Sequence, residues 1–157
     1  MYLIYSTLTL FSLKFGYQEI FQDSNIIFEE SLFKITKKIE QQNFFLNENL
    51  LKIDSVQILE ISFLITRLDQ IVRLMKILNQ SNQLRNESKE KSPETFEWTK
   101  NSIKDNLELI ITETQIIIKL IEKLIAQKDI VHKSSFIEIA NEMKILHLLC
   151  LGLIKSY

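Results

Sequence analysis

The sequence predicts an all-α protein, an antiparallel bundle of four to five helices with a long central helical hairpin. Three observations favour this fold. The 157 residues include only two glycines and one proline, 46% of them are apolar, and the apolar ones recur three or four residues apart over long segments. Turns with positive φ draw heavily on glycine, so a β-rich chain of this length would need more of it. We expect a single domain over residues 1–157.

An apolar N-terminal helix is expected first, within residues 1–22. The segment is rich in Tyr, Thr and Ile, which also suits a strand, but no second strand candidate exists to pair with it. The chain begins within an apolar run, as the inside of a domain would. The segment is either a core helix or an arm that contacts a partner.

The second and third helices are expected over about residues 24–45 and 50–80, separated by an Asn-rich break at 43–49. Asp23 or Ser24 is a suitable N-cap for the second. Heptad-like spacing marks the buried side of the third helix, which Leu74 and Ile77 widen. The expected core positions of the two helices are Phe28, Leu32, Ile35, Ile39, Ile61, Leu64, Leu68, Ile71, Met75 and Leu78.

A polar loop is expected at residues 81–92, followed by helices over about 93–128 and 135–155. Ser92-Pro93-Glu94 is a strong start signal, and the segment from Ser135 to Glu138 has the sequence of a capping box. Thr114, on the buried stripe, is expected to bond the preceding turn. The other core positions are Phe96, Ile103, Leu107, Ile110, Ile117, Ile121, Leu124, Ile139, Met143, Leu146, Leu149 and Leu153.

Charge and cysteine content limit the possible functions. Nineteen basic and twenty acidic residues give a net charge of -1, whereas a protein that binds nucleic acid on its own is usually basic. Cys150 is the only cysteine, so we expect it to pack as a small hydrophobic residue. Neither apolar stretch, 1–15 or 136–154, is typical of a membrane span or a cleaved signal peptide. We expect a cytoplasmic protein.

No pattern in the sequence predicts catalysis, a cofactor or a metal site. Asp129 and His132 have the acid-x-x-His spacing of di-iron bundles, but the second such motif is missing. No histidine lies four to six residues after an arginine, as helical nucleases of the HEPN type require. The Glu-x-x-Glu pairs that begin at Glu87 and Glu94 lack the Glu-x-x-Asp that follows in helical pyrophosphatases. With two glycines, a phosphate-binding loop cannot form.

Pairs and triplets of basic residues are the remaining candidate binding groups. Spacings of three or four residues place each group on one helix face, where it could follow a phosphate backbone or simply be solvated. Trp98, in the first turn of a helix, could anchor a protein partner. The candidate nucleic-acid-binding residues are Lys34, Lys37, Lys38, Arg73, Lys76, Lys119 and Lys123.

Apolar surface in excess of what one bundle can bury predicts a non-catalytic subunit of a multi-subunit assembly. In size, helix content and lack of catalytic residues the chain resembles the small helical subunits of CRISPR effector complexes. That resemblance implies a role in holding RNA or DNA by its backbone, although the near-neutral charge differs from that family. The alternatives are a stand-alone homo-oligomeric interaction or regulatory module, similar to an antitoxin, and an enzyme with an unrecognised site.

Overall fold

A computed structural model describes residues 17–88, 92–127 and 132–157. Within these ranges the chain forms four helices and no strand, which confirms the all-α fold class: α2 (Tyr17–Asn49), α3 (Ser55–Ser88), α4 (Pro93–Ile125) and α5 (Lys133–Ile154). Of the helix expected within residues 1–22, residues 1–16 lie outside the described ranges and 17–22 belong to α2. The N-cap expected at Asp23 or Ser24 is wrong, because α2 is a continuous helix through both residues.

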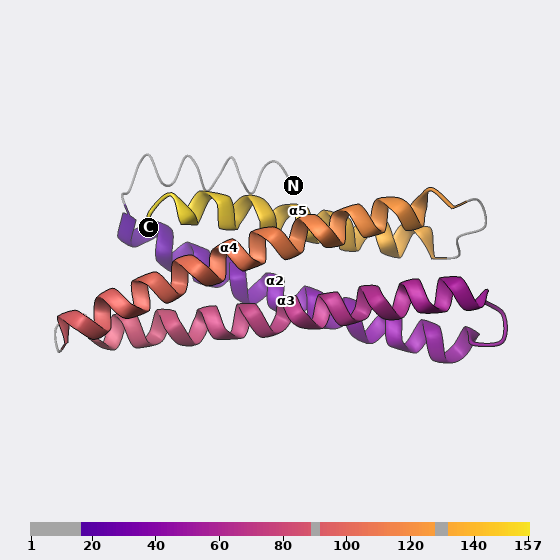
Figure 1. Cartoon of the computed structure of the whole chain (residues 1–157), viewed down its shortest axis with the longest axis horizontal. Helices are drawn as coiled ribbons and strands as arrows, with labels where there is room; N and C mark the ends of the chain where they lie inside the picture. The colour runs from indigo at the N-terminus through magenta and orange to yellow at the C-terminus, as the bar shows by residue number, and fades with distance from the viewer. Residues whose placement is uncertain (1–16, 89–91, 128–131) are drawn as a thin grey trace.

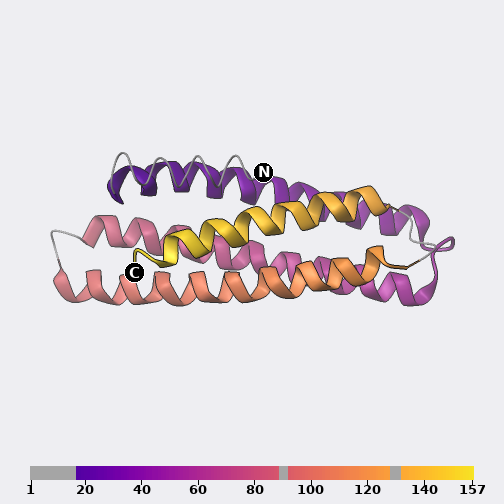
Figure 2. The same cartoon turned by 90° about the horizontal axis from the view of Figure 1, so that it is seen from above.

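Each of the four helices packs against two others. The neighbouring pairs are α2 with α3, α3 with α4, α4 with α5, and α5 with α2, whereas the described backbones of α2 and α4, or of α3 and α5, do not approach each other closely. The helices lie alongside one another along the long axis of the molecule (Figures 1 and 2). They therefore occupy the corners of a four-sided bundle, in which α2 and α4 are diagonally opposite.

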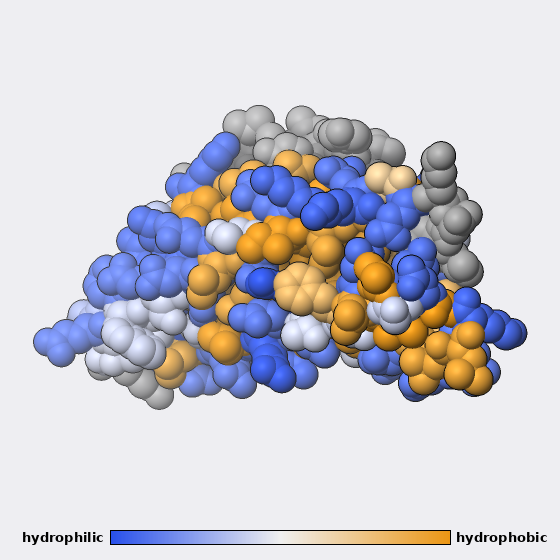
Figure 3. Space-filling model, turned by 45° about the vertical axis from the view of Figure 1, so that its right-hand side comes forward, coloured by the Kyte–Doolittle hydropathy of each residue, from blue (hydrophilic) through white to orange (hydrophobic). Residues whose placement is uncertain are grey.

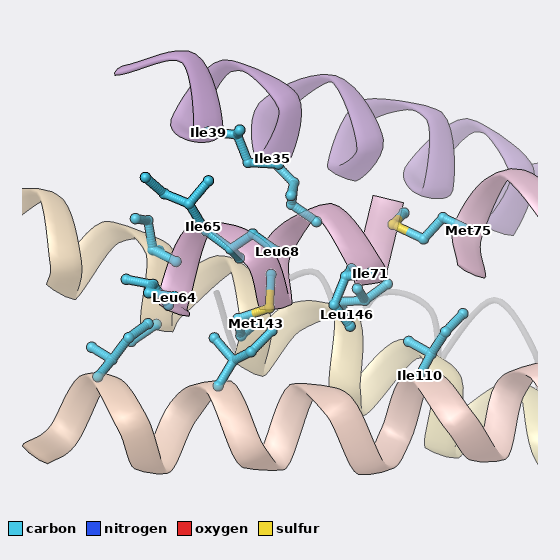
Figure 4. Close-up of a cluster of buried hydrophobic side chains, with 14 of the residues drawn as sticks. Ile35, Ile39, Leu64, Ile65, Leu68, Ile71, Met75, Ile110, Met143 and Leu146 are labelled. Carbon is cyan, nitrogen blue, oxygen red and sulfur yellow. The ribbon is translucent and has the colours of Figure 1, made fainter. Parts of the chain in front are cut away.

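All four helices contribute to one core. Figure 4 shows Ile35 from α2, Leu68 from α3, Ile110 from α4 and Met143 from α5 with their side chains in the space between the ribbons. Of the core positions predicted from spacing, all are buried except Leu32 and Phe96, which are half-buried. Ile77, expected to widen the buried stripe, is instead 45% exposed.

The Asn-rich break predicted at 43–49 is wrong, because α2 continues as a helix to Asn49. Asn49 closes the helix: its side-chain amide donates to the Phe45 carbonyl at 2.9 Å, and its own carbonyl accepts from the Lys52 and Ile53 amides. Asp54 then begins α3, since its carboxylate accepts from the Val56 amide at 3.4 Å. Five residues, 50–54, make the turn in place of the seven-residue break.

The polar loop predicted at 81–92 is also wrong for most of its length, because α3 runs on to Ser88. Arg85 explains the extension. Its guanidinium lies 5.3 Å from the centre of the Phe96 ring on α4 and donates to the Tyr157 hydroxyl at 2.8 Å. Burial, opposed in part by the charge of Arg85, raises the pKa of Tyr157 to about 12. These contacts give a polar helical turn tertiary partners that its composition does not predict.

The start signal of α4 is confirmed, and that of α5 is wrong. The Ser92 hydroxyl accepts from the Thr95 amide, with Pro93 in the first helical position. By contrast α5 begins after His132, which has a left-handed backbone (φ 68°) and no side-chain cap. Ser135 of the expected capping box lies inside the first turn, where its hydroxyl accepts from the buried Gln42 amide at 2.7 Å.

Thr114 bonds the preceding turn as expected, and it also contacts α5. Its hydroxyl donates to the Ile111 carbonyl at 2.8 Å and lies 2.9 Å from Nδ1 of His147. Cys150 is fully buried, which raises the pKa of its thiol and confirms its packing role.

Candidate protein-interaction face on α3 and α4

Two of the three predicted basic residues on α2 form ion pairs with α5. The Lys34 ammonium lies 3.8 Å from a Glu142 carboxylate oxygen, and the Lys38 ammonium donates to Glu138. The hydrogen bond and the charge of Lys38 lower the pKa of Glu138. Lys37 lies over the exposed Phe33 ring of its own helix, at 5.2 Å from the ring centre. Lys34 and Lys38 therefore help join α2 to α5.

The other four predicted basic residues are exposed on α3 and α4. Arg73, Lys76, Lys119 and Lys123 form no ion pair with any residue in the described ranges. Because α2 and α4 are diagonally opposite, the lysines of α2 and those of α4 do not share a surface. The structure thus brings together fewer of the predicted basic residues than their helix spacing alone allows.

The outer side of α3 and α4 carries a row of exposed apolar side chains. On each helix the members are separated by seven residues or a multiple of seven, apart from Trp98, which lies eleven residues before Leu109 on α4. Those on one helix therefore share a side of it. We call this surface the α3–α4 face. Its members are Val56, Phe63, Ile77 and Leu84 on α3, and Trp98, Leu109 and Ile116 on α4.

The contact between Arg67 and Glu113 indicates that these two rows lie on the same side of the bundle. Arg67 donates to both oxygens of Glu113 at 3.0 and 3.3 Å, and its guanidinium lies 5.0 Å from the centre of the Phe63 ring. Leu109 and Ile116 are one turn before and after Glu113, so they lie close to this pair. Leu84 directly precedes Arg85, and Trp98 lies eleven residues, about three turns, before Leu109, so it shares that side of α4.

At the other end of the seam between α3 and α4, the Gln127 side chain bonds to α3. Its amide donates to the Glu60 carboxylate at 2.7 Å, one turn before Phe63. The seam between α3 and α4 is thus tied by polar contacts, while the apolar side chains beside it stay open to solvent: Trp98 is 64% exposed and Phe63 is 47% exposed.

Trp98 is the only member of the α3–α4 face that the sequence predicted as a binding residue. Ile77 was expected to face the core, and the others fell outside the main apolar stripes. A signal for them does exist, because Val56, Phe63, Ile77 and Leu84 form a second seven-residue series two positions away from the buried one. Only the packing of α3 shows which of the two series is inside.

A second apolar surface, the turn patch, lies where α2 meets α3. It consists of Phe44, Leu50, Leu51 and Leu59, all of which are exposed. Figure 3 shows hydrophobic side chains gathered at the lower right corner of the view and others scattered among hydrophilic ones across the same side of the molecule. Apolar surface is therefore present on more than one part of the bundle.

Candidate metal ligands do not gather among the described residues. Within residues 17–88, 92–127 and 132–157, no three His, Cys, Asp or Glu side chains come together as a metal ion would require. Of the acid-x-x-His motif, Asp129 lies outside the described residues and His132 packs against the Phe45 ring at 4.0 Å. Glu94 and Glu97 are both exposed on the first turns of α4.

None of the described helices is both long enough and apolar enough to cross a bilayer. No family model matches the sequence, and no significant match exists among curated proteins or solved structures.

Proposed function

We propose that this chain is a non-catalytic, cytoplasmic helical subunit that packs against other protein chains in a larger assembly. The α3–α4 face is the observation that carries the proposal. Large apolar side chains open to solvent on one side of a bundle whose core is already filled are typical of a protein-binding surface. Trp98 is its strongest anchor, since tryptophan is enriched among the residues that dominate binding energy.

The bundle itself is best described as antiparallel, which is the finer form of the predicted fold. The contacts between α3 and α4 support this arrangement. As the residue number rises on α3 from Glu60 through Arg67 to Arg85, the number of the partner on α4 falls from Gln127 through Glu113 to Phe96. A hairpin of this kind presents both outer helix surfaces to one partner.

Purification of the tagged chain from its native cells tests the proposal. We expect wild-type protein to co-purify with other chains in fixed proportion, and Trp98→Ala or Phe63→Ala to reduce their recovery while the circular dichroism spectrum is unchanged. Leu151→Ala on α5 is the matched control, because it removes an exposed apolar side chain away from the α3–α4 face. Recovery that is the same for all four proteins would contradict the proposal.

Contact with a nucleic-acid backbone is a second candidate function, and the four exposed basic residues of α3 and α4 favour it. The resemblance to CRISPR small subunits would make such binding part of an assembly. Reversing charge at Arg73 and Lys76, or at Lys119 and Lys123, should then weaken binding by the assembled complex equally for all sequences. The slope of the logarithm of the binding constant against the logarithm of salt concentration should decrease in magnitude by about one for each phosphate that is no longer neutralised. Lys144→Glu, an exposed position on α5, is the control; equal salt slopes in all variants would exclude this function.

A further inference from the structure

We propose that the α3–α4 face binds a second copy of this chain about a two-fold axis that crosses the two helices near Gln70 and Thr112. The proposal rests on the proposed function, since it names a partner for the same face. A two-fold interface must be complementary to itself, so that if one residue contacts another, the reverse contact occurs as well. On α3 the match is one of apolar spacing, and on α4 it is one of opposite charges.

Four of the five exposed large apolar residues of α3 are symmetric about Gln70, and Leu59, whose counterpart would be Ser81, is the exception. Phe63 and Ile77 lie seven residues before and after it, and Val56 and Leu84 lie fourteen residues before and after it. A second α3 that runs in the opposite direction would therefore place Phe63 against the partner's Ile77, and Val56 against the partner's Leu84. Each of these four residues would meet another apolar residue.

On α4 a pair of opposite charges is symmetric about Thr112, and the two apolar residues near it are offset from symmetry by one position. Leu109 and Ile116 lie three and four residues from it, and Asp105 and Lys119 lie seven residues before and after it. Asp105 and Lys119 are both exposed, and neither has an ion pair in the part of the chain that the structure describes. An opposed second α4 would set Asp105 of each copy against the partner's Lys119.

The two centres of symmetry lie at the same level of the bundle. The Arg67–Glu113 contact joins α3 three residues before Gln70 to α4 one residue after Thr112. One axis can therefore serve both helices, so that α3 packs on the partner's α3 while α4 packs on the partner's α4. If the two rows were displaced from each other along the bundle, no single axis could match both.

The size of the face is sufficient for a stable dimer. Val56 and Leu84 are 28 residues apart, which is about 42 Å along a helix, and two adjacent helices are about 20 Å wide. The product, about 800 Å², is what each partner contributes to a standard protein–protein interface. Trp98, fourteen residues before Thr112, would lie against the partner's Ala126 and fill the space that this small side chain leaves.

Charge exchange between Asp105 and Lys119 tests the axis directly. We expect the full-length chain to sediment as a dimer, and Asp105→Lys or Lys119→Asp alone to raise the dissociation constant at least about tenfold, because each creates two like-charge contacts across the axis. The double variant Asp105→Lys/Lys119→Asp should recover wild-type affinity to within about threefold, since it restores both pairs with their signs exchanged. Circular dichroism checks that all variants keep their helix content.

Glu40→Lys, an exposed change of the same charge on α2, is the control and should leave the dissociation constant unchanged. A wild-type monomer at all concentrations, or a double variant as weak as the single ones, would overturn the proposal. Either result, combined with loss of co-purifying chains in Trp98→Ala, would leave the proposed function standing while this inference fails. The test also separates dimer formation from nucleic-acid binding. The double variant should restore the dimer, but it leaves an acidic residue in place of Lys119 and so should not restore a phosphate contact at that position.

Discussion

The side of the bundle formed by α2 and α5 differs from the side formed by α3 and α4 in its contacts between helices, although Phe33 on α2 and Ile137 and Leu151 on α5 are exposed. On the first, polar groups bond across the two helices: Gln42 with Ser135, Lys38 with Glu138, and Lys34 with Glu142. On the second, the Arg67–Glu113 ion pair lies beside a row of exposed apolar side chains. Polar contacts that are already satisfied within the chain leave little for a partner, whereas unburied apolar surface gains stability only when a partner covers it.

The largest expected effect on stability comes from comparing two neighbouring residues of α4, one on its inner side and one on its outer side. Ile110 is fully buried, and Leu109 is 51% exposed on the α3–α4 face. We expect Ile110→Ala to lower the free energy of unfolding by about 2–5 kcal/mol, because it leaves a cavity in a packed core. Leu109→Ala should change it by less than about 0.5 kcal/mol in the monomer.

Urea unfolding at low protein concentration, where any association is minimal, measures both values for this pair of variants. Equal losses for Ile110→Ala and Leu109→Ala would contradict the assignment of inner and outer sides to α4, and with it the α3–α4 face.

The buried polar contact between α2 and α5 offers a test of intermediate size. Ser135→Ala removes the group that accepts from Gln42, whose other side-chain atom, Oε1, already lacks a partner among the described residues. We expect a loss of about 1–3 kcal/mol, since a buried donor is left without a partner. The added change Gln42→Leu should recover much of it, because both polar groups are then gone.

A double-mutant cycle on thermal or urea unfolding gives the coupling between Gln42 and Ser135. Additive losses from the two single variants would show that the contact does not stabilise the α2–α5 side.

The smallest expected effect on stability is that of the Lys38–Glu138 ion pair, and it depends on pH. The pKa of Glu138 is lowered in the folded chain from 4.5, so the pair contributes stability above pH 4.5 and loses it as the pH falls through the lowered value. Glu138→Gln should therefore unfold at a lower temperature than wild type at neutral pH, and the difference should disappear in acid.

Thermal unfolding across this pH range measures the difference between wild type and Glu138→Gln. Glu48→Gln, an exposed carboxylate of α2 for which no ion pair is seen among the described residues, is the control. A difference that stays constant down to the lowest pH would exclude an ionic origin for the effect.

The sequence by itself determined the helices and most of their buried sides. Spacing of three, four and seven residues predicted the core stripe of α3 from Ile61 to Leu78, and Ser92-Pro93-Glu94 predicted the start of α4 to the residue. Both signals are local: one repeats with the helix period, and the other satisfies free amides within a single turn. Such information needs no knowledge of what lies across the bundle.

Only the tertiary structure decided where α2 and α3 end and which surfaces stay open. Polar composition predicted breaks at 43–49 and 81–92, yet burial of Phe45 on the first segment and the contacts of Arg85 on the second keep them mostly helical. Likewise, a helix wheel places Lys38 on a solvated face, and the register of α5 sets it on Glu138. Contacts between distant segments depend on how the helices are aligned, and that alignment is fixed by the sum of the core packing rather than by any one pattern along the chain.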